Sequence, residues 1–263
     1  NGLHESPYKG ASVEFAEHRE YVAGDDLRRL DWKVFAKTDR FYVKEYEEET
    51  NLKAYVVVDV SKSMTYGSHA LTKIEYARQV AAALAYLVRR QGDAAALVLF
   101  DEKVKKFLPP STSPAHLRNI CAALVESEPS EKTDVGVIFH EVAERLRQRS
   151  LVLIVSDLFD KVERVVSGIN HMAHRGHDVV VLHVLDPAET EFPFDAMTRF
   201  EGLEIDEKLL ADPRSLRDAY VAEVKAFQQA VKTACLAGRM DYVVLDTSRS
   251  PAIPLASYLP MRA

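Results

Sequence analysis

The sequence predicts an α/β fold: a doubly wound, mostly parallel sheet with one antiparallel edge strand, preceded by a β-rich N-terminal extension. Short apolar runs rich in β-branched residues alternate with longer segments that repeat apolar residues at helical spacing. The apolar runs carry few charges, which is typical of strands covered by helices on both faces. Because the order strand–helix–strand recurs, right-handed crossovers and a mostly parallel sheet are expected.

The composition is that of a globular protein with a sizeable core. The chain has 263 residues, 47% of them hydrophobic, and a formal net charge of −6. The acidic balance argues against a nucleic-acid partner, because nucleic-acid surfaces are usually basic. No apolar run reaches the length of a membrane span and no signal peptide is visible, so we expect a cytoplasmic protein without a membrane segment. Cys121 and Cys235 match no metal or redox spacing, which favours free thiols.

Residues 1–53 are polar, charged and aromatic, and we expect them to form an extension that packs on the core. Two segments, 13–22 and 41–48, alternate loosely, as strands do. A short amphipathic helix is expected between them, capped by Asp25 or Asp26. Its basic residues leave a docking surface as an alternative, although charged helix faces are usually only solvated.

A doubly wound, Rossmann-like core domain is expected over residues 54–263, and it begins with the stretch AYVVVDVSKSM. The apolar run at 55–58 predicts a central strand that is buried on both faces. A long helix over 73–90 follows, and Gly92 stands where a helix commonly ends.

A second buried strand, 94–100, leads into a charged segment, 103–108, which we expect to be the antiparallel edge strand that Pro109 and Pro110 stop. Residues 186–213 are acidic and rich in proline and phenylalanine, which favours a loop or a small β insertion. The remaining elements continue the alternation. They are helices at 114–126, 135–149, 162–174 and 216–236, and strands at 151–155, 178–185 and 240–245.

Three oxygen-bearing side chains follow the first core strand at the point where it ends. Asp59, Ser61 and Ser63 form the pattern D-x-S-x-S. In open parallel sheets, ligands bind at the carboxyl ends of the strands, so this pattern indicates a site for a hard metal ion. The alternative is a serine-rich turn that caps the next helix.

Two later segments bring similar side chains toward the same edge of the sheet. Thr133 and Asp134 precede a predicted helix, and Ser156 and Asp157 end a predicted strand. Hydroxyl and carboxylate oxygens suit Mg²⁺ or Mn²⁺. Carboxylates gathered at one edge would repel one another, and a divalent cation would relieve that repulsion.

The segments VVVDVSKSM, KTDVG and LVLIVSDL resemble the three loops of a von Willebrand factor A domain. The long segment EFAEHREYVAGDDLRRLDWKVFAKTDRFYVKEYEEETN and the later HVLDPAETEFPF resemble domain-of-unknown-function family 58. The resemblance implies a metal-ion-dependent adhesion site. Its ligands here would be Asp59, Ser61, Ser63, Thr133 and Asp157.

The resemblance also implies a function. It points to a non-enzymatic interaction module that binds a partner's acidic side chain through Mg²⁺ or Mn²⁺. Because the family commonly accompanies MoxR-type AAA+ ATPases, such an ATPase is the implied partner, in chaperone-like assembly. Two departures concern the shape of the loops: SEKTDVG is not glycine-rich, and leucine follows Asp157 where many members have glycine.

A metal-dependent phosphoester hydrolase is the alternative function, since such enzymes also place an aspartate after a buried strand. A second carboxylate is then expected at position 61, where this chain has serine. The sequence contains no P-loop, dinucleotide-binding or nucleophile-elbow motif.

Histidines form a second, weaker candidate for a metal site. His171, His174 and His177 are spaced by three, but they fall at a predicted helix end, where histidine complements the helix dipole. His183 lies in a predicted buried strand, which favours a hydrogen-bonded core histidine.

Overall fold

The computed structural model describes residues 14–22, 25, 30–47, 52–129, 134–203 and 208–252. The chain divides into two compact units, residues 1–51 and residues 52–262. Packing of the N-terminal extension on the core stays a prediction.

The first unit is a small antiparallel pair with a helix in its connection. Strand β1 (Glu14–Glu20) pairs with β2 (Tyr42–Glu47), and α1 (Trp32–Thr38) lies between them in the chain. The expected capping residue was wrong: the Asp31 carboxylate accepts hydrogen bonds from the backbone N–H groups of Lys33 and Val34. Asp25 instead accepts from the Val22 N–H, and Asp26 lies outside the residues that the structure describes.

The second unit contains a six-stranded sheet in the order β10-β7-β6-β3-β4-β5. All neighbouring strands are parallel except β5, which runs antiparallel to β4 at the edge. The predicted fold class is therefore confirmed. The strands are β3 (Lys53–Asp59), β4 (Ala94–Phe100), β5 (Val104–Ser111), β6 (Leu151–Ser156), β7 (Asp178–Leu185) and β10 (Asp241–Asp246).

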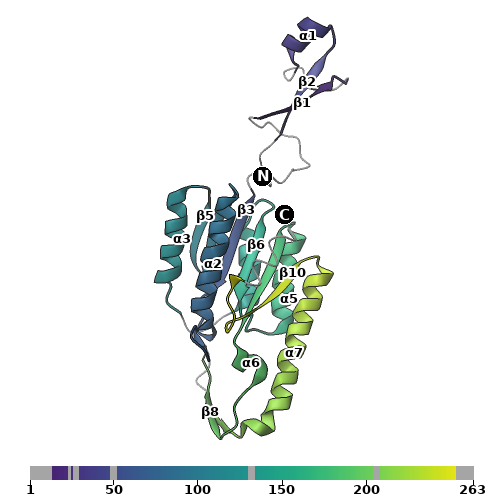
Figure 1. Cartoon of the computed structure of the whole chain (residues 1–263). Coiled ribbons are helices and arrows are strands. Elements are labelled where there is room, and N and C mark those ends of the chain that lie inside the picture. Colours follow the sequence, from purple (N-terminus) through teal and green to yellow (C-terminus); the bar gives the residue numbers. More distant parts are fainter. Residues whose placement is uncertain are drawn as a thin grey trace. The chain divides into compact units, whose positions relative to one another are not determined.

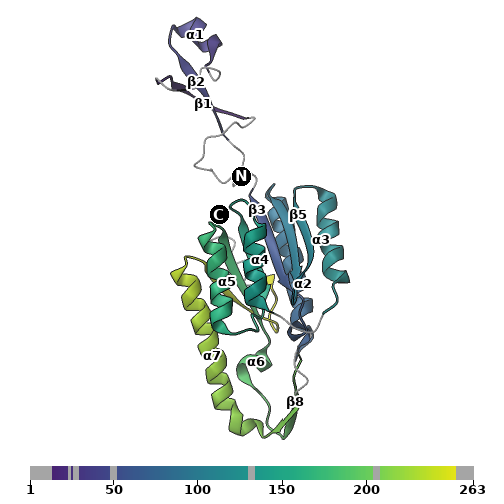
Figure 2. The ribbon, with the colours of Figure 1, turned by 180° about the vertical axis from the view of Figure 1, so that it is seen from behind.

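Helices cover both faces of this sheet (Figures 1 and 2). Successive residues of β3 point to opposite faces, so Val56 packs in one hydrophobic cluster and Val57 in the other. Helices α2 (Lys73–Arg90) and α3 (Pro114–Glu126) belong to the first cluster. The second cluster contains α4 (Val135–Arg145), α5 (Val162–His174) and α7 (Pro213–Ala237).

Three expected boundaries were wrong, and one of them is the start of α7, at Pro213 rather than at residue 216. Strand β5 continues through Pro109 and Pro110 to Ser111. The register against β4 shifts between Ala95 and Leu97, opposite the two prolines, so they lie at an irregularity of an edge strand, where proline is tolerated. Helix α4 ends at Arg145 rather than at residue 149, and the next residue already has extended backbone.

The interruption between β7 and α7 contains a short helix and a hairpin. Helix α6 (Pro187–Glu191) follows β7 directly, and β8 (Thr198–Glu201) pairs with β9 (Lys208–Ala211). The Phe192 ring stacks on Phe200 and contacts Tyr220 of α7, which anchors the hairpin to that helix. The predicted small β insertion is thus present.

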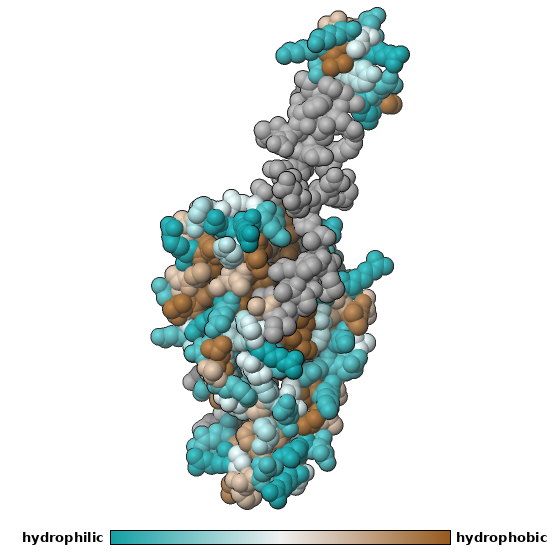
Figure 3. Space-filling view, in the orientation of Figure 1, coloured by the Kyte–Doolittle hydropathy of each residue, from teal (hydrophilic) through white to brown (hydrophobic). Residues whose placement is uncertain are grey.

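On the face of the second unit that Figure 3 shows, hydrophobic residues lie between hydrophilic ones. No helix in the described part of the chain combines the length and the apolar character that crossing a membrane requires. Both cysteines have free thiols.

Candidate functional site

The site lies where the central parallel strands end. Val58 pairs with Val155 in the sheet, so the next residues, Asp59 and Ser156, are neighbours. Asp59 is fully buried, and its carboxylate accepts hydrogen bonds from the Ser61 N–H at 2.9 Å and the Ser156 hydroxyl at 2.6 Å. The strand register therefore brings two of the predicted segments together.

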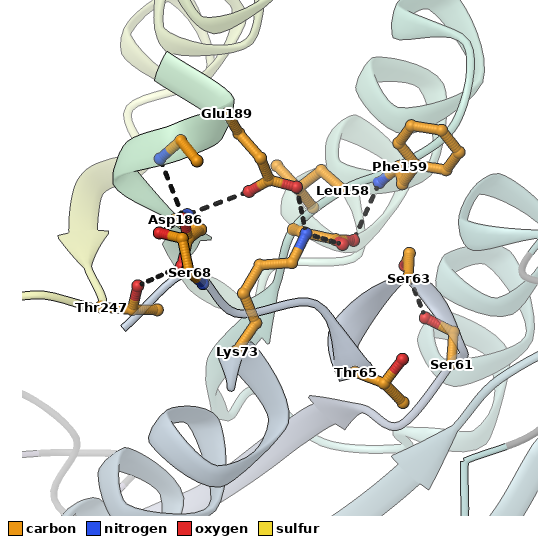
Figure 4. Close-up of polar contacts among 12 residues, drawn as sticks. Ser61, Ser63, Thr65, Ser68, Lys73, Leu158, Phe159, Asp186, Glu189 and Thr247 are labelled. Atoms are coloured by element: carbon orange, nitrogen blue, oxygen red, sulfur yellow. Dashed lines mark hydrogen bonds and ion pairs between the residues drawn. The ribbon is translucent and has the colours of Figure 1, made fainter. Parts of the chain in front are cut away.

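Ser61 and Ser63 turn their hydroxyl groups toward each other (Figure 4). Their Oγ atoms are 3.0 Å apart. Two neighbouring ligands of an octahedral Mg²⁺ at about 2.0–2.1 Å lie about 2.9 Å from each other, so this separation suits two ligands of one ion. The short 3₁₀ helix η2 (Ser63–Thr65) fixes the turn that carries them.

Burial raises the pKa of Asp59 to about 7, and the nearby Asp157 carboxylate acts in the same direction. Hydrogen bonds from Ser156 and Ser61 offset only part of this effect. A buried carboxylate with this pKa lacks a compensating charge. The electrostatics of the site thus fit a divalent cation.

Asp157 is paired with a cation from the chain itself. The Lys73 ammonium lies 2.7 Å from Asp157 Oδ2 and 2.5 Å from Glu189 Oε1, and Figure 4 shows it in the middle of this cluster. Lys73 is only 2% exposed. Burial would lower the pKa of Lys73, but the two carboxylates outweigh it and hold that pKa above its usual range.

Both Asp157 carboxylate oxygens thus have partners within the chain, because Oδ1 accepts the Phe159 N–H at 3.2 Å. Each carboxylate oxygen has two lone pairs, so these partners leave room for a metal ion, as they do at Asp59, where both oxygens also accept hydrogen bonds. The role of Asp157 as a ligand stays a prediction, as do those of Asp59, Ser61 and Ser63.

Thr133 lies outside the residues that the structure describes. Its neighbour Asp134 caps helix α4 by accepting the Val137 N–H, and its other oxygen pairs with Arg164 at 2.6 Å. Asp134 therefore serves the start of α4. Within the described residues, no three His, Cys, Asp or Glu side chains gather as a metal cage, so the candidate site depends on serine hydroxyls.

Sequence reasoning missed the buried ion cluster, although one signal was present. Lys73 stands at the first position of α2, where a cation opposes the helix dipole and is unfavourable without a partner. Glu189 belongs to a capping box with Asp186 at the start of α6. The Lys73 position indicates a tertiary partner, whereas the capping box places the Glu189 carboxylate at the start of α6 by local contacts.

The loop after β6 is held in an unusual conformation. Leu158 has a φ of 55°, in the left-handed region that favours glycine. Its side chain is fully buried, and its N–H donates to Ser156 Oγ at 2.8 Å, so packing and this hydrogen bond offset the strain. The next side chain, Phe159, is 62% exposed beside the site.

His183 is a hydrogen-bonded core histidine, as expected. Its Nε2 lies 3.0 Å from the Asp157 carbonyl oxygen and its Nδ1 lies 2.7 Å from the Tyr242 hydroxyl. Burial lowers the pKa of His183 to about 4, so the ring is neutral at pH 7 and Nε2–H donates to Asp157. His183 thereby fixes the backbone at the candidate ligand.

The three histidines spaced by three do not gather. His171 faces His140 of the neighbouring helix α4, His174 is exposed, and His177 is buried. The sequence spacing alone therefore did not identify the contact that His171 makes.

Comparison with known proteins gives a family match, curated relatives and matches to solved structures. The model of a family described as "Protein of unknown function DUF58" matches residues 17–230. An uncharacterized protein, Rv1480 of Mycobacterium tuberculosis, is 28% identical over 197 residues, which cover 73% of this chain. The match spans only 61% of the length of that curated relative.

The sequence identity to the solved structures is low, so these matches show a similar fold and nothing about function. BatB from Bacteroides thetaiotaomicron is 17% identical at a TM-score of 0.55, with 80% of this chain and 97% of that chain covered. An aerotolerance-related membrane protein from Bacteroides fragilis is 16% identical at a TM-score of 0.54, with 80% and 99% covered. The chain therefore belongs to the DUF58 family, and its second unit has a von Willebrand factor A-like fold.

Proposed function

We propose that this chain is a non-enzymatic protein-interaction module that captures an acidic side chain of its partner through a Mg²⁺ or Mn²⁺ site. Asp59, Ser61 and Ser63 would hold the ion directly, with Thr133 and Asp157 completing the set. The observation that carries the proposal is the pair of serine hydroxyls 3.0 Å apart beside the buried Asp59 carboxylate. A bound ion would offer an open coordination position to a carboxylate.

The exposed Phe159 supports capture of a protein rather than of a small molecule. An aromatic side chain beside a charged site offers an apolar contact next to the acidic group, as in the centres of many protein interfaces. We propose a MoxR-type AAA+ ATPase as the partner, in chaperone-like assembly, because family 58 commonly accompanies such ATPases.

Replacing Ser61 and Ser63 together with alanine is expected to weaken Mn²⁺ binding at least tenfold, because two direct ligands are lost. Binding is measured from the electron paramagnetic resonance signal of free Mn²⁺. Thr65→Val is the matched control in the same turn, since the Thr65 hydroxyl donates to the Lys62 carbonyl at 2.7 Å. Equal Mn²⁺ affinity in the double variant and wild type would refute the ligand assignment.

Replacing Phe159 with serine is expected to weaken capture of the purified ATPase at least tenfold and to leave Mn²⁺ affinity unchanged. The loss of tenfold corresponds to about 1.4 kcal/mol of apolar contact. Capture is measured with immobilised ATPase in Mg²⁺ and in chelator. Capture by the wild type that chelator does not reduce would overturn the metal-mediated mechanism.

The hydrolase alternative has a separate outcome. Metal-dependent turnover of a phosphoester panel by the wild type, lost in the Ser61→Ala/Ser63→Ala variant, would establish that function instead. The serine at position 61, where the alternative expects a carboxylate, is the reason we favour the binding module.

A further inference from the structure

Helices α4 and α5 lie side by side on one face of the sheet (Figure 2), and one histidine from each helix contacts the other. His140 of α4 and His171 of α5 place their Nδ1 atoms 2.7 Å apart, and their ring centroids are 4.8 Å apart. The two helices are held close together at glycines. A Cβ on Gly168 would lie 2.6 Å from the Phe139 Cβ and 3.1 Å from the Gly136 carbonyl oxygen.

The outer nitrogen of each ring already has an oxygen partner. His171 Nε2 lies 3.2 Å from Glu144 Oε1, and His140 Nε2 lies 3.4 Å from Ser167 Oγ. The carboxylate fixes the proton of neutral His171 on Nε2, which leaves a lone pair on its Nδ1. An imidazole whose far N–H donates to a carboxylate is the usual arrangement of a metal-bound histidine.

We propose that His140 and His171 form a binding site for a borderline divalent transition metal, Cu²⁺ or Ni²⁺ above all, separate from the candidate Mg²⁺ site. The two Nδ1 atoms would be the ligands. Imidazole nitrogen is a preferred ligand of these ions, whereas Mg²⁺ prefers oxygen.

The geometry favours ligands at a right angle. At metal–nitrogen distances of about 2.0–2.1 Å, two nitrogens at a right angle lie about 2.8–3.0 Å apart, and two at a tetrahedral angle about 3.3–3.4 Å. The observed 2.7 Å is nearest to the first value. Square-planar or octahedral ions therefore require the least movement of the two rings.

Only one proton has to move. In the metal-free neutral pair, His140 donates its Nδ1–H to His171 and accepts from the Ser167 hydroxyl. On binding, the His140 proton shifts to Nε2 and the Ser167 hydroxyl becomes its acceptor, so neither ring changes charge. No third His, Cys, Asp or Glu completes a cage in the described part of the chain, so further positions stay open to solvent.

Access to the pair is available from the surface. A shallow hollow of about 230 Å³ is lined by His140 and Ser167 together with Gly136, Val137, Glu163 and Arg164. The side chain of His171 is 29% exposed. His140 therefore borders the hollow and His171 is partly exposed while both helices stay folded.

The test uses untagged protein and Cu²⁺ or Ni²⁺ alone. Calorimetry is expected to give one ion per chain, with affinity at least tenfold lower in His140→Gln and in His171→Gln. His174→Gln, an exposed histidine on the same helix, and Asp59→Asn are expected to bind as the wild type does. The Cu²⁺ electron paramagnetic resonance spectrum of the wild type is expected to show coupling to two imidazole nitrogens, one from each histidine.

Two results would overturn the proposal. If the wild type binds Cu²⁺ or Ni²⁺ no more tightly than the His140→Gln variant, the two histidines form a hydrogen-bonded pair and not a metal site. Binding that Asp59→Asn abolishes would place the ion at the strand ends instead. The spectrum of the wild type decides the matter even where a variant folds poorly, since absence of nitrogen coupling contradicts the assignment.

Discussion

Replacing Lys73 with methionine is expected to lower the free energy of unfolding by about 3–5 kcal/mol, because it leaves buried carboxylates without their cation. Asp157 and Glu189 both contact the Lys73 ammonium, at 2.7 and 2.5 Å. Methionine keeps most of the side-chain volume, so the loss reports charge rather than packing. For a unit of this size, the melting temperature should fall by about 10 °C.

The matched control is Lys62→Met, which changes an exposed lysine near the same site and should alter stability by less than about 0.5 kcal/mol. Adding Glu189→Gln to Lys73→Met removes one of the unpaired charges and should restore part of the loss. Chemical denaturation of the four proteins gives these values. A loss below about 1 kcal/mol in Lys73→Met would mean that solvent reaches the cluster and screens it.

Replacing Asp59 with asparagine is expected to abolish Mg²⁺ binding and yet to stabilise the metal-free protein at pH 8. The pKa of Asp59 in the folded chain is raised to about 7, mainly by burial. At pH 8 the wild type therefore carries a buried carboxylate that asparagine replaces with a neutral group of the same shape. Between acidic pH and pH 8, the shifted pKa of Asp59 lowers the free energy of unfolding of the wild type by about 4 kcal/mol relative to the variant.

The sign of the pH dependence follows from the raised pKa. Between about pH 4 and pH 7 the folded wild type holds a proton on Asp59 that the unfolded chain has lost, so stability falls as pH rises through this window. The Asp59→Asn variant lacks this contribution. Denaturation of both proteins in chelator from pH 4 to pH 8 should show a widening gap in favour of the variant.

His183 titrates in both proteins, so the difference between them isolates Asp59. Saturating Mg²⁺ at pH 8 should raise the stability of the wild type alone, because the ion binds only the folded state. A constant gap across the pH range, or equal stabilisation of both proteins by Mg²⁺, would contradict the assigned role of Asp59.

Much of the fold could be predicted because hydrophobic pattern and strand order are local and repetitive. The apolar run before Asp59 and the D-x-S-x-S pattern together indicated both the central strand and the edge where the site lies. The extent of β5 could not be predicted from Pro109 and Pro110, because their tolerance depends on the edge position of the strand and on the register shift opposite them. That is a property of the assembled sheet.

The parts of the site that escaped prediction are long-range contacts. Lys73 and Glu189 are separated by more than a hundred positions and meet only because β7 ends beside β6. The contact between His140 and His171 likewise depends on how closely α4 approaches α5. In each case the residue type was visible in the sequence, but its partner was fixed by packing.

Asp186 has a consequence for how this end of the second unit opens. Its fully buried carboxylate accepts the Ser68 N–H and the Ala188 N–H, each at 2.9 Å, and the Thr247 hydroxyl at 3.1 Å. Burial alone would raise the pKa of Asp186, but these hydrogen bonds hold it below its usual value. One carboxylate thus ties together three segments that are far apart in the chain. If any one segment moves away, the Asp186 carboxylate loses a hydrogen bond and is exposed to water. The three segments therefore open together, as one cooperative unit.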